Sequence, residues 1–242
     1  MTFPLHRFEE FGELGAAEQA AVAALAAPPR RYARNQVIRR EGGVASEFYL
    51  LIDGWVSSSV TLPSGGRQIM KFHLPGDALG TPSMSVARAA ETLTALTPAT
   101  VSAVSFDRFG TLLRDHPRVT AMFLLSCQRE RVALMDWLTS VGRTLSEARL
   151  AALLIDLCER LQPLGLVKDD VFDMLVTQEQ IGDALGLTAV HVNRTMRQLE
   201  EMGLIARDRH SLRLRDRAGL HRIAAAPKRA LRTDLSWLPP AA

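Results

Sequence analysis

Polar and basic side chains gather between residues 177 and 197, where the spacing predicts two short helices joined by a tight turn. Thr177 is placed to cap the first helix with Gln180 as its reciprocal partner, and Thr188 is placed to cap the second. Gly186 lies between them, where a tight turn favours positive φ. Hydroxyl, amide and guanidinium groups on a short helix are the donors that bind DNA phosphates and base edges. The segment therefore predicts a helix-turn-helix whose second helix enters a major groove.

The second of these helices has one apolar row and one polar row. Val192, Met196 and Leu199 follow at spacings of four and three, which is typical of a buried face. The donors and cations between them fall largely on the outer face. The alternative is a plain helical hairpin with a solvated arginine face. We predict DNA contacts at Thr177, Gln178, Thr188, Val190, His191, Asn193, Arg194, Arg197, Arg209 and His210.

A basic hairpin is predicted directly after the second helix. Residues 205–207 and 211–214 have strand patterns, and Asp208, Arg209 and His210 lie between them as a turn. Residues 191–242 contain 11 Arg and Lys against 5 Asp and Glu, or +6, whereas residues 143–190 contain 4 against 8, or −4. The net charge of the whole chain is only +3, so the positive charge is concentrated where an anionic partner would bind. Together the elements predict a winged helix-turn-helix.

The elements before this domain have a different character. The chain has 242 residues, 47% hydrophobic and 23% charged, which fits one or two globular domains at about 150 residues each. Short β-branched and aromatic runs alternate with Gly-rich turns, which is typical of an antiparallel sandwich or barrel. The runs are 36–38, 48–52, 55–56, 69–72 and 101–104. We predict an α+β fold whose N-terminal part is an antiparallel β-barrel of the jelly-roll type.

One long helix is predicted from Pro117 to Val141, because this stretch contains no glycine or further proline. Gly142 should end it, and Thr144 with Glu147 should form the capping box of the next helix, 145–161. The predicted boundaries are 1–116 for the barrel, 117–142 for the long helix, 143–224 for the winged domain and 225–242 for a tail. A row of apolar residues on the long helix predicts either a dimer interface or packing against its own domain. The row is Val119, Met122, Leu125, Val132, Met135 and Leu138.

From residue 31 to about residue 218 this architecture resembles the Crp/Fnr family of bacterial transcription regulators. The resemblance rests on Gly54, on Gly76 with Asp77, on the long helix and, most specifically, on Leu187 to Thr195. It implies an effector-sensing barrel of the cyclic-nucleotide-binding type and a homodimer held by the long helix. It also implies a two-fold symmetric DNA operator and contact with RNA polymerase.

The resemblance assigns roles on the second helix of the motif. Arg194 matches the arginine that donates to a guanine, while Thr177, Gln178, Thr188 and His191 match positions that hold the phosphate backbone. Cyclic-AMP-responsive members have Arg-Glu where this chain has Ala189 and Val190. A valine can contact a thymine methyl but accepts no hydrogen bond from cytosine. We therefore expect a different operator sequence.

The barrel departs from the pattern that binds cyclic AMP. Thr81 stands at the position of the ribose-binding carboxylate, and ungapped counting puts Glu91 and Thr92 where an arginine pair belongs. A carboxylate there would repel a phosphate, so we predict that cyclic AMP is not the effector. Arg88 would restore a cation if the loop were shorter. The candidate pocket residues are Thr81, Ser83, Arg88, Glu91, Thr92 and, on the long helix at the adenine position, Leu134 and Met135.

The sequence predicts no metal site and identifies no cofactor. Cys127 and Cys158 are too few for an iron–sulfur cluster and are expected to be buried thiols, with redox sensing as the alternative for Cys127. His73 is the haem-ligand candidate in the barrel, but a lone strand histidine favours a structural role. No catalytic motif, signal peptide or membrane helix is apparent, so we expect a cytoplasmic protein that is not an enzyme.

Two alternatives to a cyclic-AMP-independent DNA-binding regulator remain at this point. The first keeps the DNA role and makes the barrel a sensor of haem or another small ligand. The second is a cyclic-nucleotide-binding module that acts through a protein partner, with the winged domain as a docking surface.

Overall fold

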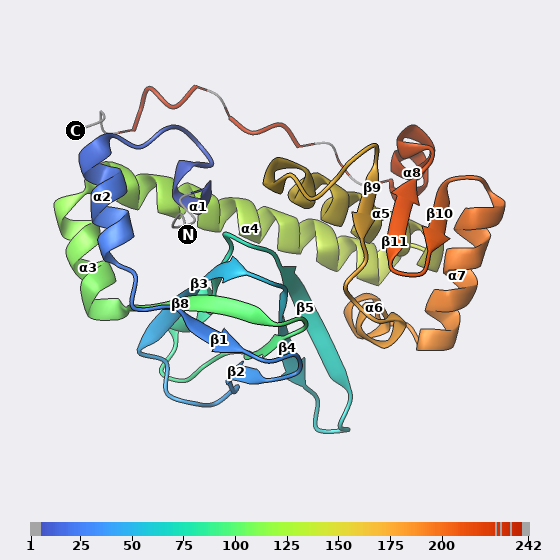
Figure 1. Cartoon of the computed structure of the whole chain (residues 1–242), viewed down its shortest axis with the longest axis horizontal. Helices are drawn as coiled ribbons and strands as arrows, with labels where there is room; N and C mark the ends of the chain where they lie inside the picture. Colours follow the sequence, from blue (N-terminus) through green and yellow to red (C-terminus); the bar gives the residue numbers. More distant parts are fainter. Residues whose placement is uncertain (1–5, 226, 228, 233, 239–242) are drawn as a thin grey trace. The chain divides into compact units, whose positions relative to one another are not determined.

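The computed structural model describes residues 6–225, 227, 229–232 and 234–238. The described residues divide into two units (Figure 1). The barrel unit comprises residues up to 60, residues 70–132 and the described residues from 229 onward, and the winged unit comprises 61–69 and 133–228.

The barrel consists of two four-stranded antiparallel sheets, with strand orders β1-β8-β3-β6 and β2-β7-β4-β5, and only the tip of its β4–β5 hairpin, residues 61–69, is grouped with the winged unit. This confirms the predicted antiparallel barrel and adds three strands that the sequence patterns missed, β1, β6 and β7. The strands are β1 Arg30–Tyr32, β2 Val37–Arg39, β3 Glu47–Asp53, β4 Val56–Thr61, β5 Arg67–His73, β6 Ala78–Leu79, β7 Thr92–Ala95 and β8 Ala99–Ser105.

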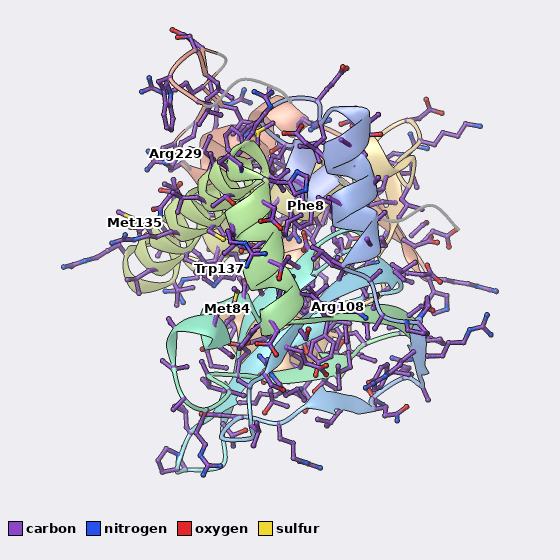
Figure 2. The ribbon with its side chains drawn as sticks, turned by 90° about the vertical axis from the view of Figure 1, so that its left-hand side faces the viewer. Phe8, Met84, Arg108, Met135, Trp137 and Arg229 are labelled. Atoms are coloured by element: carbon purple, nitrogen blue, oxygen red, sulfur yellow. The ribbon has the colours of Figure 1, made fainter. Side chains whose placement is uncertain are left out.

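The central strand β3 supplies two separate cores because successive side chains point to opposite faces. Tyr49 and Leu51 pack inside the barrel, whereas Phe48 and Leu50 pack outside it against helices. The helices of that outer layer are α1 His6–Glu9, α2 Ala16–Ala24, α3 Phe106–Asp115 and the first part of α4 Pro117–Arg143. Phe8 lies between the ribbons of α2 and α4 (Figure 2), and its ring stacks on Phe123 with centroids 5.6 Å apart.

The long helix is confirmed as α4, but its end differs from the prediction. The helix continues through Gly142 to Arg143, because the glycine has helical geometry and no close neighbour. Thr144 does not cap the next helix, since its hydroxyl donates back to the carbonyl of Ser140 at 2.8 Å. Leu145 takes the N-cap position of α5 Ser146–Leu161 and makes no side-chain cap bond. The predicted capping box of Thr144 and Glu147 is therefore wrong.

The winged unit packs α7 and α8 against α5. After α5 come β9 Val171–Asp173, α6 Gln178–Leu185, α7 Ala189–Glu201, β10 Ile205–Asp208, β11 Ser211–Leu214 and α8 Arg217–Ala224. The hairpin predicted after α7 is β10-β11, and β9 pairs with β11 as a third antiparallel strand. The fold class is thus confirmed.

The tail after α8 carries a side chain into the core of the barrel unit. Leu238 is buried in the same cluster as Phe8 and Phe123, and Leu235 packs against that cluster from its edge. Trp237 between them is exposed. No role was predicted for the tail, because two leucines three residues apart beside prolines match no helix or strand pattern. No helix in the described part of the chain is long and apolar enough to cross a membrane.

Candidate nucleic-acid interface

The turn between α6 and α7 is fixed by two capped helix starts and one left-handed residue. Thr177 accepts a hydrogen bond from the Gln180 N–H at 3.2 Å, and the Gln180 side chain accepts one from the Thr177 N–H at 2.9 Å. Thr188 accepts from the His191 N–H at 3.2 Å. Gly186 between the helices has φ 68°. These local predictions are confirmed, and they set where α7 begins.

Gly182 is a positioning residue that the sequence reading missed. A Cβ at this residue of α6 would lie 2.4 Å from the carbonyl oxygen of Leu187 in the turn. The Leu187 N–H in turn donates to the Gly182 carbonyl at 2.9 Å. The backbone of the turn therefore approaches α6 as closely as only glycine allows. A glycine inside an otherwise helical pattern was the available signal, since such a residue often marks close packing.

Helix α7 separates an apolar inner face from an accessible outer one. Val192, Met196 and Leu199 are buried, as their spacing predicts. Val190 in the first turn is 81% exposed, and Arg194 and Arg197 on the same helix are also exposed. An exposed valine beside these two cations suits contact with a thymine methyl in a major groove.

The polar side chains of the interface are held by neighbours within the winged unit. Gln178 donates its amide to Asn193 Oδ1 at 3.3 Å, which links the first turn of α6 to α7. His191 Nε2 lies 3.2 Å from the hydroxyl of Ser146, at the start of α5, and 3.3 Å from Arg194 Nη2. Ser146 is a further residue that the sequence did not single out, because its partner lies 45 residues away.

The cations of this surface differ in their freedom to bind an anion. Arg194, Arg197 and Arg209 form no salt bridge with any described residue. Arg207, by contrast, donates two hydrogen bonds to Glu200, at 2.6 and 3.0 Å. These bonds lower the pKa of Glu200, and the carboxylate offsets the charge of Arg207. Arg194, Arg197 and Arg209 are therefore the arginines available to bind base edges or phosphates.

The turn of the wing presents Arg209 and His210 to solvent. Arg209 has φ 43°, a left-handed conformation that a non-glycine residue adopts at a cost. The carbonyl of His210 accepts a hydrogen bond from the Met174 N–H at 2.7 Å, which ties the turn to the segment after β9. The structure therefore brings every predicted DNA-contact residue to the accessible surface of α6, α7, the turn between them or the hairpin.

The predicted dimer row on α4 does not lie on one face. Val119 and Met122 are fully buried in the barrel unit's own core, so their assignment to a dimer interface is wrong. Leu125 packs against the same core, whereas Met135 and Leu138 are 58% and 73% exposed. Steps of three residues fall short of the helical repeat of about 3.6, so the row winds around the helix from the core to the surface. Val132, between these ends, is half-buried.

The exposed apolar row of α4 follows another register. Leu124, Met135 and Leu138 are exposed, with Leu134 beside them at 45%. Positions 124, 131, 135 and 138 recur at spacings of seven, four and three, which keep to one face as in a coiled coil. Figure 2 shows Met135 at the outer side of the α4 ribbon. The sequence pattern did not predict this row, because buried apolar residues lie between its members and Arg131 interrupts it.

The structure does not bring the candidate effector residues together in one pocket. Ser83 and Glu91 lie together, buried against Arg39, a cation that the sequence reading did not include. Arg39 Nη2 lies 2.8 Å from Glu91 Oε1, so the carboxylate is paired with a cation from β2. Burial nevertheless raises the pKa of Glu91, and Arg39 opposes this effect.

The other candidate effector residues do not join this cluster. Arg88 is exposed and donates to the carbonyl of Gly42 at 3.3 Å, and the Thr92 hydroxyl accepts from the Glu41 N–H at 3.0 Å. Thr81 is half-buried at the start of a short 3-10 turn, Thr81–Ser85. Leu134 and Met135 are exposed on the part of α4 that belongs to the winged unit.

The remaining cofactor candidates are engaged within the protein. His73 is buried, with Nε2 3.1 Å from the Ser58 hydroxyl and Nδ1 3.7 Å from Asp77. Cys158 is buried, and burial raises its thiol pKa, while Cys127 is partly covered by the outer core of the barrel unit. Over the described residues, no group of three or more His, Cys, Asp or Glu side chains is placed to hold a metal ion.

Two family models match the two units of this chain. Residues 29–116 match the cyclic nucleotide-binding domain, and residues 148–223 match the Crp-like helix-turn-helix domain. Together they cover the barrel strands and the elements from α5 to α8.

Curated relatives match over most of their length. The nitrogen fixation regulation protein FixK of Bradyrhizobium diazoefficiens is 30% identical over 81% of this chain and 81% of its own. The transcriptional activatory protein AadR of Rhodopseudomonas palustris is 32% identical over 89% of this chain and 88% of its own. Among solved structures, FixK2 from Bradyrhizobium japonicum superposes with a TM-score of 0.77 at 27% identity, over 84% of this chain and all of that one.

Proposed function

The chain belongs to the Crp/Fnr family of transcription regulators, and we propose that it binds a palindromic operator as a homodimer and recruits RNA polymerase. Members of this family regulate transcription through a helix-turn-helix domain and are not enzymes. The observation that carries the proposal is the outer face of α7. There Val190, Arg194 and Arg197 are exposed. Neither arginine forms a salt bridge with a described residue, although the charge of Arg197 helps to lower the pKa of Glu200.

The two sides of the proposed contact have different tasks. Arg194 has the donor geometry to bind a guanine edge bidentately, and Val190 offers an apolar surface to a thymine methyl. Arg209 at the wing supplies charge to the flanking phosphates. Gln178 and Asn193 support each other across the two helices, so their amides start from fixed positions. Base contacts thus come from the start of α7 and phosphate contacts from its surroundings.

Base-resolved binding tests the role of Arg194. An operator is first selected from random double-stranded DNA, and each base pair of a half-site is then varied. We expect Arg194→Ala to lose about 1–3 kcal/mol of discrimination at one base pair of each half-site. Arg160→Ala is the matched control, because that arginine lies on α5 and pairs with Asp156 at 3.0 Å. Equal weakening on all sequences would reduce Arg194 to a phosphate contact.

A homodimer is proposed because α4 leaves Leu124, Met135 and Leu138 in water. Such a row is stabilised when a second copy of the same helix covers it, and a two-fold dimer presents two α7 helices to successive major grooves. Sedimentation tests this directly. We expect Leu138→Glu to shift the protein from dimer to monomer, and Ala133→Glu, about half a turn away on the exposed helix surface, to leave the dimer intact. A wild-type protein that sediments as a monomer contradicts the proposal.

The proposed regulator acts without cyclic AMP, haem or an iron–sulfur cluster. Two cysteines cannot supply the ligands of a cluster, and the His73 ring already contacts Ser58 and Asp77. Calorimetry with cyclic AMP and an absorbance spectrum of the purified protein test these points. Micromolar binding of the nucleotide or a Soret band would overturn the respective statement. The DNA target places this activity in the cytoplasm.

A further inference from the structure

A buried charge pair lies inside the barrel, between β2 and the segment that precedes β7. Arg39 is the last residue of β2 and is 7% exposed, and Glu91 directly before β7 is 6% exposed. Arg39 Nη2 donates to Glu91 Oε1 at 2.8 Å and to the hydroxyl of Ser83 at 2.8 Å. Ser83 is fully buried in the 3-10 turn. The guanidinium of β2 thus joins two neighbouring positions that lie 44 and 52 residues further along the chain.

The surroundings of Arg39 are shaped to hold this cation. Its Nη1 donates to the carbonyl of Glu47 at 3.1 Å, and its guanidinium lies 5.9 Å from the centroid of the Tyr49 ring. Gly80, with φ 79°, leaves space for it, because a Cβ there would lie 2.5 Å from Arg39 Nη2. The guanidinium is therefore held between fixed neighbours, and a residue larger than glycine at position 80 would displace it.

The same surroundings have the composition of a small anion site. Arg39 contributes a fixed positive charge, and its buried Nε has no hydrogen-bond partner in the described structure. The hydroxyl of Ser83 is held by the Ala90 N–H at 3.1 Å and lies 3.3 Å from Glu91 Oε1. A guanidinium and a hydroxyl that both donate to one oxygen are the groups that bind carboxylates and phosphates. In this chain that oxygen is Glu91 Oε1, so the bound carboxylate belongs to the protein itself.

We propose that Glu91 is an internal anion that fills the barrel's Arg39–Ser83 site and thereby excludes phosphate or phosphodiester ligands from it. This rests on the proposed function in one respect, because it gives the physical reason for a barrel that does not respond to cyclic AMP. An external anion has to displace a carboxylate that is already desolvated and tethered by the chain, and tethering gives that carboxylate a large advantage over a ligand in solution.

Removing the internal anion tests the proposal. Glu91→Ala deletes the atoms of an acetate ion, so acetate is the probe of matched size, and orthophosphate is the larger tetrahedral probe. We expect the melting temperature of Glu91→Ala to fall below that of wild type. It should then rise with acetate concentration in the manner of a ligand that binds only the folded state, with chloride added to keep the ionic strength constant. The wild type should show no such rise with acetate, orthophosphate or cyclic AMP.

Two control variants separate the site from general salt effects. Glu41→Ala removes an exposed acid close in sequence to Arg39, and we expect it to respond to acetate as the wild type does. Arg39→Met combined with Glu91→Ala lacks the cation, so its acetate response should vanish. Glu91→Gln replaces the alanine variant in the test if that variant does not fold, because the amide oxygen still accepts the hydrogen bond from Arg39 while the negative charge is lost. We expect orthophosphate to raise the melting temperature of Glu91→Gln, but by less than acetate raises that of a folded Glu91→Ala.

The outcomes are distinct. Acetate recovery in Glu91→Ala that depends on Arg39, or recovery of soluble Glu91→Ala only in acetate, supports the internal anion. A folded Glu91→Ala, or in its place a folded Glu91→Gln, that ignores both anions reduces the pair to a structural contact and overturns the proposal. Stabilisation of the wild type by orthophosphate or cyclic AMP that Arg39→Met removes overturns it as well. The experiment contains no DNA, so its failure leaves operator binding untouched.

Discussion

Replacing Gly182 by alanine should misplace the recognition helix through a single added methyl group. The Cβ would meet the carbonyl oxygen of Leu187 at 2.4 Å. That oxygen belongs to the backbone of the α6–α7 turn, so no side-chain rotation relieves the contact. The turn must move, and with it Thr188, whose hydroxyl caps α7.

The expected magnitude follows from two opposing terms. Alanine is favoured over glycine inside a helix by about 0.8–1.0 kcal/mol, whereas overpacking costs about 1–3 kcal/mol. Gly142→Ala supplies at most the first term and none of the second, because Gly142 lies in the last turn of α4 with no neighbour within 4 Å of an added Cβ. The difference in unfolding free energy between the two variants is therefore no larger than the strain, which we expect to be about 1–3 kcal/mol.

Urea unfolding followed by circular dichroism measures this difference, and a DNA titration of both variants measures its effect on binding. We expect Gly142→Ala to be neutral or stabilised, with unchanged DNA affinity. Gly182→Ala should be the less stable of the two and bind the selected operator more weakly. If Gly182→Ala gains as much stability as Gly142→Ala and binds normally, the close approach of turn and helix does not position α7, and the reasoning fails.

Three further predictions concern single contacts. Hydrogen bonds from Arg207 lower the pKa of Glu200, so its contribution is present above the ordinary value of 4.5 and lost as pH falls through the lowered pKa. The stability difference between wild type and Glu200→Gln, which we expect to be under about 1 kcal/mol, should therefore shrink in acid unfolding curves. Arg209→Gly should change the free energy of unfolding by less than about 0.5 kcal/mol, because relief of the positive φ offsets the larger conformational entropy that glycine has in the unfolded chain. The same variant should lower the slope of log binding constant against log salt concentration by about 0.9 per protomer. An unchanged slope would show that Arg209 does not contact DNA. Leu238→Ala should cost about 2–3 kcal/mol in thermal unfolding, whereas Leu231→Ala, which is 43% exposed, should stay within about 0.5 kcal/mol, and equal effects would show that the tail does not dock.

The sequence predicted those parts of the site that short-range chemistry determines. The caps at Thr177 and Thr188 involve partners three residues away, and the positive φ of Gly186 follows from its place after a helix. The same logic failed at Thr144, where an equally good capping pattern lost to a hydrogen bond with the carbonyl of Ser140 in the preceding turn. A helix that continues through Gly142 supplied that competing acceptor.

Contacts between distant segments lay beyond the sequence patterns. Arg39 and Glu91 are 52 residues apart, and neither residue type nor spacing indicated that the two meet inside the barrel. The α4 row failed for another reason, since one helix packs against its own unit near Val119 and presents apolar residues to solvent near Leu138. A single stripe could not describe a helix whose environment changes along its length.

The affinity ratio between the selected operator and a scrambled duplex of the same length tests the central claim most directly. The titration is made with the wild-type protein at about 0.15 M salt, where non-specific phosphate binding is partly screened. We expect the operator to bind at least about 1,000-fold more tightly than the scrambled duplex, and Arg194→Ala to lower this ratio. Equal affinity for both duplexes would contradict the claim, whatever the strength of binding.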